Sequence, residues 1–161
     1  MYIKSKFMLL GGIFMGKSCY LGKSGKNEFE IPYSGYSFQE GMCLISALGA
    51  GAKYGYINKN GVIAIKVQYD RAQYFSEGLA AVAFGYKYGY IDKQGNTVIG
   101  MQFGEAGDFS EGLAAVRIDG KWGFIDKSGK MVIKPAFDAY IKSIDTFYQN
   151  RNCALPHFAV N

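Results

Sequence analysis

The sequence has little of the material from which most catalytic and metal sites are built. Its 161 residues include one histidine, three cysteines, three prolines and one tryptophan. A single histidine leaves a serine or cysteine nucleophile short of a base, and a structural zinc site needs about four ligands. No apolar run reaches the roughly 20 residues of a membrane-spanning helix. We therefore expect no catalytic, metal-binding or cofactor-binding residues and no transmembrane segment.

The cysteines and the first residues bear on the cellular compartment. Cys19, Cys43 and Cys153 are odd in number and far apart, which argues against a disulfide framework and predicts a reducing, cytoplasmic environment. Residues 1–18 carry lysines followed by an apolar stretch, as a signal peptide does, so the alternative is a secreted protein or one lipid-anchored at Cys19. Lys17 stands where a small or apolar residue is needed. The segment is interpreted instead as a divergent first strand.

Glycine and aromatic residues are abundant, with 22 Gly, 13 Tyr and 12 Phe. Aromatic side chains favour strands and glycine favours tight turns, so the composition predicts many short strands joined by hairpins. The net charge of +5 favours acidic partners. Lysine supplies most of this charge, whereas proteins that recognise nucleic-acid bases mainly use arginine.

An internal repeat is the strongest signal in the chain. The motif KYGYI or KWGFI begins at Lys53, Lys87 and Lys121, 34 residues apart each time (87 − 53 and 121 − 87). Two further motifs keep the same order and distance. FSEGLAAV begins at Phe75 and Phe109 with a degenerate copy at Phe38, and an Asn/Asp-Lys-x-Gly motif begins at Asn58, Asp92 and Asp126. One unit of strands and turns has therefore been copied along the chain.

The repeat divides the chain into three parts. Residues 38–138 hold about three clear copies. Residues 1–37 are predicted to be a divergent first repeat unit, in which Gly16-Lys17 aligns with the turn at Gly120-Lys121. Residues 139–161 are predicted to form a non-repeat C-terminal cap and tail. Apolar side chains at helical spacing in residues 138–150 predict a short amphipathic helix that covers the end of the array.

Each copy is predicted to be a three-stranded β-meander. In the last copy the strands are expected at residues 113–118, 122–126 and 131–134, with a primed turn at Asp119-Gly120 and another turn at Ser128-Gly129. Gly123 recurs between aromatic residues, which indicates close approach of a neighbouring ring or backbone. The predicted fold is all-β: tandem three-stranded units stacked as a solenoid-like array, with a short C-terminal capping helix. A closed propeller is the alternative, although propeller blades usually have four strands.

These motifs resemble the WG-repeat (KWG-repeat) family, which is named for the dipeptide present here as Trp122-Gly123. The resemblance covers about residues 38–138. Tyr54 and Tyr88 replace the tryptophan of the family name, which is a conservative departure from the pattern. Family membership implies an all-β array of a bacterial type that acts as an interaction module without enzymatic chemistry. It leaves the ligand open.

Two kinds of side chain would form columns if the units stack. The aromatic column either builds the core or, where exposed, offers a surface for glycan or cell-wall sugar rings. The lysine columns either form a solvated edge or offer a surface for a polyanion such as nucleic acid. The candidate binding residues are the aromatic column Tyr54, Tyr88 and Trp122 and the lysine columns Lys53, Lys87, Lys121 and Lys59, Lys93, Lys127.

Three other patterns resemble known sites but lack the necessary context. Residues 11–18 match the phosphate-loop pattern GxxxxGK[ST], yet the glycines that follow break any helix behind it. Cys153 and His157 are four residues apart, but the other cysteines lie far away in sequence. Carboxylates repeat at equivalent turns, whereas a catalytic pair is singular and asymmetric. These acids are interpreted as turn and cap residues: Glu40, Glu77, Glu111, Asp92 and Asp126.

The function predicted from these observations is a non-catalytic binding or scaffold module for protein–protein interaction. Such a short chain would be an accessory or adaptor subunit of a larger assembly, and its partner would be a larger protein. Glycan binding through exposed aromatic residues is the first alternative. Nucleic-acid binding through the lysine columns is the second.

Overall fold

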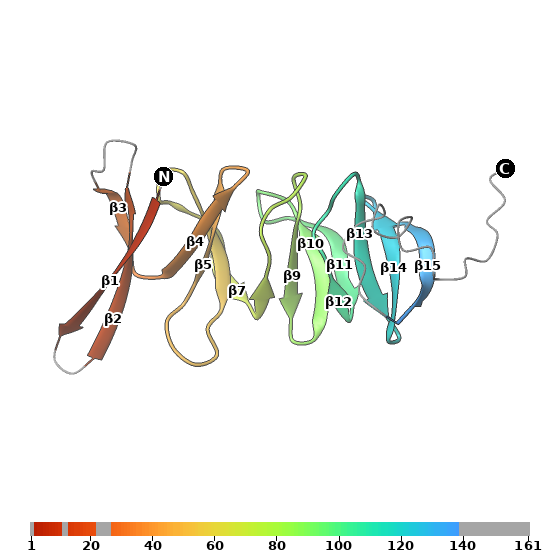
Figure 1. The fold of residues 1–161 in the computed structure, drawn as a ribbon, viewed down its shortest axis with the longest axis horizontal. Helices are drawn as coiled ribbons and strands as arrows, with labels where there is room; N and C mark the ends of the chain where they lie inside the picture. Colours follow the sequence, from red (N-terminus) through yellow and green to blue (C-terminus); the bar gives the residue numbers. More distant parts are fainter. Residues whose placement is uncertain (1, 11–12, 22–26, 139–161) are drawn as a thin grey trace.

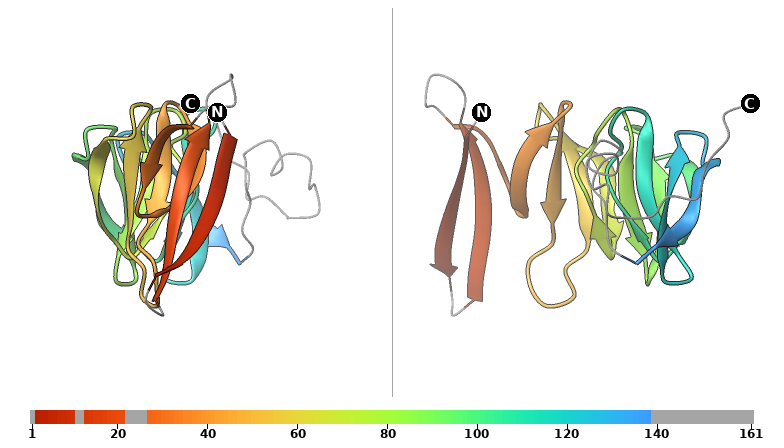
Figure 2. Two further views of the ribbon diagram at one scale, coloured as in Figure 1. Left: turned by 90° about the vertical axis from the view of Figure 1, so that its left-hand side faces the viewer. Right: turned by 45° about the vertical axis from the view of Figure 1, so that its right-hand side comes forward.

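The computed structural model describes residues 2–10, 13–21 and 27–138. Within these ranges the chain forms fifteen strands in four antiparallel sheets and no helix. The sheets follow one another along the long axis in chain order (Figure 1). Seen along that axis they lie one behind another (Figure 2). The prediction of an all-β repeat protein is confirmed.

Each sheet is a meander whose strands pair in chain order. The first sheet has three strands: β1 (Tyr2–Leu10), β2 (Ile13–Leu21) and β3 (Asn27–Ile31). The second sheet contains β4 (Ser34–Gln39), β5 (Met42–Ser46), β6 (Tyr54–Asn58) and β7 (Ile63–Tyr69). The third contains β8 (Arg71–Ala72), β9 (Ala80–Phe84), β10 (Lys87–Ile91) and β11 (Thr97–Phe103). The fourth contains β12 (Glu105–Ala106), β13 (Leu113–Ile118), β14 (Lys121–Asp126) and β15 (Met131–Phe137).

The prediction of three strands per clear unit is wrong, because the second to fourth sheets have four strands each. The additional strand in the third and fourth sheets is an edge strand of two residues. Arg71 pairs with Ala83, and Glu105 pairs with Arg117. Two residues are too short to show the alternation by which a strand is recognised in a sequence. The strand count therefore no longer argues against four-stranded propeller blades.

The turns of the last unit were predicted correctly. Its first hairpin turns at Asp119 and Gly120, whose φ angles are 48° and 81°. Positive φ at both central residues is the geometry of a primed turn, which matches the twist of the flanking strands. The predicted first strand coincides with β13.

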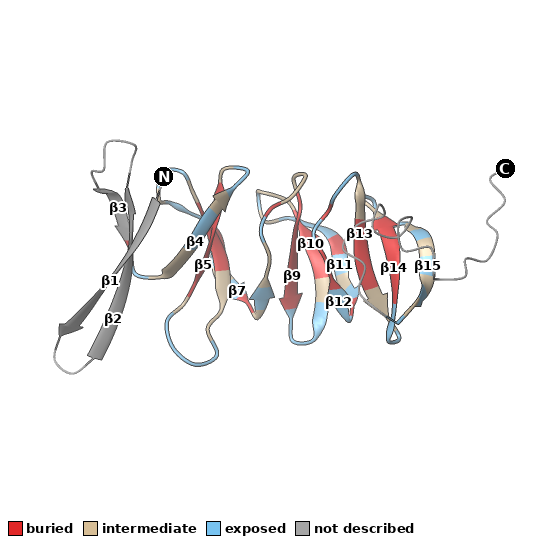
Figure 3. Ribbon diagram, viewed as in Figure 1, coloured by how far each residue is buried: buried red, intermediate tan, exposed pale blue. Residues whose placement is uncertain are grey.

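Successive sheets pack face to face, and this buries both faces of the inner sheets. On β5, Cys43 and Ile45 pack with Ile31 of the first sheet. Met42 and Leu44, on the opposite face, pack in a cluster that extends into the third sheet. The same arrangement joins the third sheet to the fourth. Every residue of β5 is therefore buried, and buried strands recur in the third and fourth sheets (Figure 3).

The repeated glycine of the KYGYI motif lies against backbone. A Cβ atom on Gly89 would stand 2.5 Å from the carbonyl oxygen of Ile99, and one on Gly123 would stand 2.5 Å from that of Ile133. In both places the pairing register with the next strand is interrupted. The predicted close approach is confirmed, and the neighbour is the irregular segment of the adjacent strand.

Several predictions concern the ends of the chain. Gly16 and Lys17 lie inside β2, paired with Phe7 and Lys6 of β1. The turn predicted at Gly16-Lys17 is therefore wrong. A strand through Lys17 also lacks the helix start that a phosphate loop requires. The predicted capping helix and the Cys153–His157 pair fall in residues 139–161, outside the described residues.

Candidate functional site

Most of the candidate lysines are engaged with carboxylates. Lys53 forms an ion pair with Asp70, and Lys121 forms one with Asp138. The Nζ atom of Lys87 donates a hydrogen bond of 3.3 Å to a carbonyl, that of Gln102. Lys59 is exposed on the turn after β6. The lysine columns are thus partly neutralised by neighbouring acids.

The remaining two lysines tie neighbouring sheets together. Lys127 of the fourth sheet lies 3.1 Å from the Oε2 atom of Glu77, which is in the turn before β9 of the third sheet. The same oxygen accepts a 3.0 Å hydrogen bond from the backbone N–H of Gly112. One junction earlier, Glu40 makes the equivalent contacts with Lys93 and Gly78, both at 3.0 Å. The hydrogen bond from Lys127 lowers the pKa of the Glu77 carboxyl.

The two repeated aspartates cap their own turns. The Oδ1 atom of Asp92 accepts hydrogen bonds from the backbone N–H groups of Gln94 and Asn96. Asp126 makes the same contacts with Ser128 and Lys130. For Asp92 and Asp126 the interpretation as turn and cap residues is confirmed.

The second aromatic residue of each motif belongs to the core. Tyr90 is fully buried, its ring centroid lies 4.8 Å from that of Phe109, and its hydroxyl donates a 2.8 Å hydrogen bond to the carbonyl of Gly107. Tyr56 makes the equivalent contacts one unit earlier. Of the aromatic column itself, Tyr54 and Tyr88 are half-buried and Trp122 is buried.

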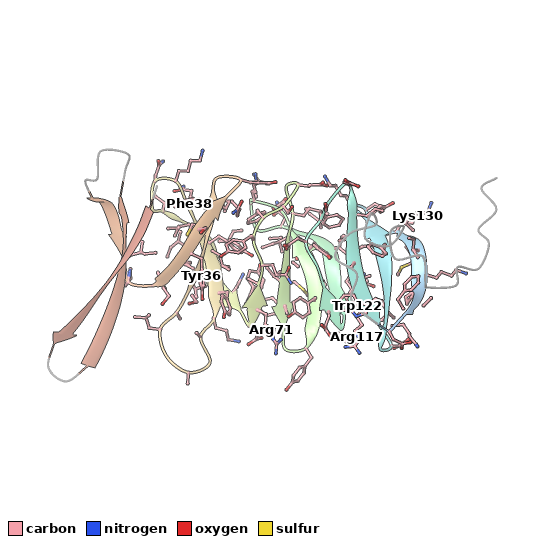
Figure 4. The ribbon with its side chains drawn as sticks, in the orientation of Figure 1. Tyr36, Phe38, Arg71, Arg117, Trp122 and Lys130 are labelled. Atoms are coloured by element: carbon pink, nitrogen blue, oxygen red, sulfur yellow. The ribbon has the colours of Figure 1, made fainter. Side chains whose placement is uncertain are left out.

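An open groove brings together two of the predicted aromatic residues, Tyr88 and Trp122. It has a volume of about 570 Å³ and lies between the third and fourth sheets. We call it the Arg71 groove. Its lining residues are Arg71, Gln73, Gly85, Tyr86, Tyr88, Gly104, Glu105, Ala106 and Trp122. Figure 4 places Arg71, Trp122 and Arg117 along one edge of the stack.

A smaller hollow adjoins this groove. Its volume is about 240 Å³, and it shares Gly104 and Glu105 with the Arg71 groove. Lys87, Arg117 and Asp119 also line it, so we call it the Lys87 hollow. It brings one of the predicted lysines next to the aromatic groove, whereas Tyr54 and the other five candidate lysines line neither depression.

Two of the acids at the two depressions are already paired, whereas Asp119 of the Lys87 hollow has no ion pair within the described residues. Glu105 accepts a hydrogen bond of 2.6 Å from the Nη1 atom of Arg117. Asp70, next to Arg71 in sequence, is paired with Lys53 and accepts a 2.8 Å hydrogen bond from the backbone N–H of Gly85. The hydrogen bond from Lys53 lowers the pKa of Asp70. Within the described part of the chain the guanidinium of Arg71 has no hydrogen bond or ion pair.

Arg71 and Tyr86 are the site residues that sequence reasoning missed. Tyr86 is 87% exposed in the turn between β9 and β10. Both residues break the 34-residue pattern, because Glu105 and Gly120 stand at the equivalent positions of the next unit. Departure from the repeat was the signal that could have found them. Residues that recur in every unit are expected to pack the units together. An exposed residue that is present in one unit only is not needed for this packing and is therefore a candidate binding residue.

The described residues meet the requirements of neither a metal site nor a membrane-spanning helix. Among residues 31–138, whose side chains the structure describes, no group of three or more His, Cys, Asp or Glu side chains is placed to hold a metal ion. Cys43 is buried, and its Sγ atom donates to the carbonyl of Tyr36. The described residues also contain no helix that could cross a membrane.

Comparison with known proteins identifies the repeat. A family model described as a WG containing repeat matches three consecutive segments, residues 54–88, 88–122 and 122–151. A search of curated proteins finds no match to the chain.

Proposed function

Because the chain belongs to the family of WG-containing repeats, we propose that it is a non-catalytic module whose Arg71 groove binds a protein partner. The observation that carries the proposal is the composition of this groove, in which Tyr86, Tyr88, Trp122 and Arg71 meet. Tyrosine, tryptophan and arginine are the residues that most often dominate the energy of protein interfaces.

The stack supplies a rigid frame for such a site. Support for an open, solenoid-like array comes from the succession of sheets along one axis (Figure 1). The hydrogen bond from Gly112 to Glu77 and the ion pair with Lys127 hold the third and fourth sheets in register. A groove built on two such sheets loses little conformational freedom when a partner binds. A cytoplasmic adaptor or accessory subunit of a larger assembly fits this design.

Glycan binding remains the second candidate, because the exposed ring of Tyr86 offers a stacking surface. The nucleic-acid alternative has less support. Four of the six candidate lysines are paired with carboxylates, and this reduces the positive charge available to a phosphate backbone.

The proposal is tested by affinity capture from the native cell extract with Tyr86→Ala. Tyr36→Ala is the matched control, because Tyr36 is also exposed (37%) but lies on β4, outside the groove. The wild-type protein and Tyr36→Ala should retain one partner in stoichiometric amount, and Tyr86→Ala should lose it. Equal retention by both variants, or recovery of a lone wild-type monomer, contradicts the proposal.

A second arm separates the glycan alternative. Trp122 is the one tryptophan of the chain and lines the groove, so its fluorescence reports on occupancy. A fluorescence change with wall polysaccharide that is lost in Tyr86→Ala would assign the groove to sugar. No change at millimolar sugar leaves the protein partner as the ligand.

A further inference from the structure

Positive charge without a partner lies at the Arg71 groove. Arg71 lies at the start of the edge strand β8, and its guanidinium has no ion pair among the described residues. The acids that could neutralise it are occupied, because Asp70 is paired with Lys53 and Glu105 with Arg117. An arginine that is left unpaired beside aromatic rings is suited to a carboxylate, which it can bind through two parallel hydrogen bonds.

A second available cation lies in the adjoining Lys87 hollow. Lys87 makes a hydrogen bond with the neutral carbonyl of Gln102, at 3.3 Å, and no ion pair within the described residues. The two depressions meet at Gly104 and Glu105. Gly104 carries no side chain, and the Glu105 carboxylate beside it is paired with Arg117. A chain that crosses this point can meet Arg71 on one side and Lys87 on the other.

The Arg71 groove itself also offers aromatic surface. Tyr88 is half-buried in the groove wall, and Tyr86 projects from the turn with 87% of its surface exposed. Neither Arg71 nor Tyr86 recurs in the next unit, where Glu105 and Gly120 take their places. The combination of free cations and aromatic surface is therefore particular to this junction of the stack.

We propose that the Arg71 groove and the Lys87 hollow together bind an extended acidic segment of the protein partner. Carboxylates of the segment pair with Arg71 and Lys87, and the side chain between them packs on Tyr86 and Tyr88. This inference rests on the proposed function and adds the chemistry of the ligand. A short groove with two cations suits a peptide better than nucleic acid, which needs positive charge along a longer path.

The probes are three labelled synthetic peptides of equal length: alternating Glu and Leu, alternating Gln and Leu, and alternating Lys and Leu. Binding is followed by fluorescence anisotropy of the label and by the fluorescence of Trp122. The Glu-Leu peptide should bind, and its affinity should fall as salt is added. The Gln-Leu and Lys-Leu peptides should bind at least about tenfold more weakly.

Two substitutions test the cations, and one provides a matched control. Arg71→Glu and Lys87→Glu should each weaken binding of the Glu-Leu peptide by about tenfold or more. Lys66→Glu makes the same change in net charge as Lys87→Glu on the exposed side of β7, outside both depressions, and should leave binding within about twofold. Because all three side chains are exposed, the variants should keep the wild-type circular dichroism. If Arg71→Glu does not keep the wild-type circular dichroism, Arg71→Gln takes its place in the binding test.

The outcomes separate this inference from the function on which it rests. Equal binding of the three peptides, no binding of the Glu-Leu peptide, or equal weakening by Lys66→Glu overturns the acidic-segment proposal. If the native partner is still captured by wild type and lost by Tyr86→Ala, the groove remains an interaction site with another ligand chemistry. A single-stranded oligonucleotide provides the last comparison. If it binds more tightly than the Glu-Leu peptide and Arg71→Glu weakens this binding, the acidic-segment proposal is overturned and the groove is assigned to nucleic acid.

Discussion

At the scale of single residues, the repeated glycine of the motif is required by the backbone that faces it. The adjacent strand interrupts its pairing opposite Gly55, Gly89 and Gly123 and brings its carbonyl groups inward. Any side chain at these positions would meet main-chain atoms, which cannot rotate away as a flexible side chain can. The second aromatic residue of the motif, which follows this glycine, is buried in the core.

Gly89→Ala tests this requirement. Its Cβ atom would lie 2.5 Å from the carbonyl oxygen of Ile99, so the strand must shift, and we expect a loss of about 1–3 kcal/mol in the free energy of unfolding. Gly100→Ala is the matched control on the facing strand, where a Cβ atom would meet nothing within 4 Å. That change should stay within about 0.5 kcal/mol of zero. Urea unfolding measures both, and equal losses would refute the close-approach explanation.

At the scale of elements, the turns do more than reverse the chain. Glu40, Glu77 and Glu111 have φ angles of 50–54° and are each followed by a glycine with positive φ. The carboxylates of Glu40 and Glu77 reach forward to the glycine N–H of the next turn and to a lysine of the next sheet. A hairpin turn thereby becomes a link between units. The Glu111 carboxylate has no such contact in the described part of the chain.

This link predicts a dependence of stability on acid pH. The hydrogen bond from Lys127 lowers the pKa of Glu77 below its usual value of 4.5 in the folded protein. As the pH falls below about 4.5, the unfolded chain therefore takes up the proton first, and stability is lost until the folded carboxyl is protonated too. Glu77→Gln should reduce this loss between pH 4.5 and the lower folded pKa. Its stability at neutral pH should be slightly lower than that of wild type.

The control for this experiment is Glu111→Gln, which makes the same change at the same position of the next turn. It should leave the acid dependence of the unfolding midpoint as in wild type. Thermal unfolding followed by circular dichroism across the acid range gives the comparison. If the two variants behave alike, Glu77 does not link the sheets.

The elements also show what sequence reasoning can and cannot reach. The hairpin at Asp119-Gly120 and the strand β13 follow from local chemistry, since a primed turn and alternating side chains leave a direct trace in the sequence. The edge strands β8 and β12 cannot be predicted in this way, because two residues are too few to show the alternation of buried and exposed side chains. The candidate site was likewise predictable only in part. Tyr88 and Trp122 were found through the motif, whereas the groove depends on how two separate sheets pack.

At the scale of the whole molecule, stability comes from sheet faces that bury one another in sequence. A residue of an inner junction is covered by the next unit, and its counterpart in the last described sheet is covered less. Ile99 is 4% exposed, whereas the equivalent Ile133 is half-buried. In such arrays each unit contributes through its interfaces with its neighbours.

Truncation of these two isoleucines tests the stacking. Ile99→Ala should lower the free energy of unfolding by about 2–5 kcal/mol, because it leaves a cavity between the third and fourth sheets. Ile133→Ala should cost at least about 1 kcal/mol less, since part of its side chain is already in water. Chemical denaturation of both variants provides the measurement. A larger loss for Ile133→Ala is incompatible with the packing described.

In the proposed arrangement, recurring residues build the stack and the non-recurring residues of the groove bind the partner. One binding measurement tests this proposal most directly. The double variant Arg71→Glu and Tyr86→Gly introduces at these positions the residues of the next unit. Its affinity for the captured partner, measured by titration against wild type, should fall by about a hundredfold, while its unfolding midpoint stays unchanged. Retention of wild-type affinity by this stable variant would contradict the assignment of the groove as the binding site.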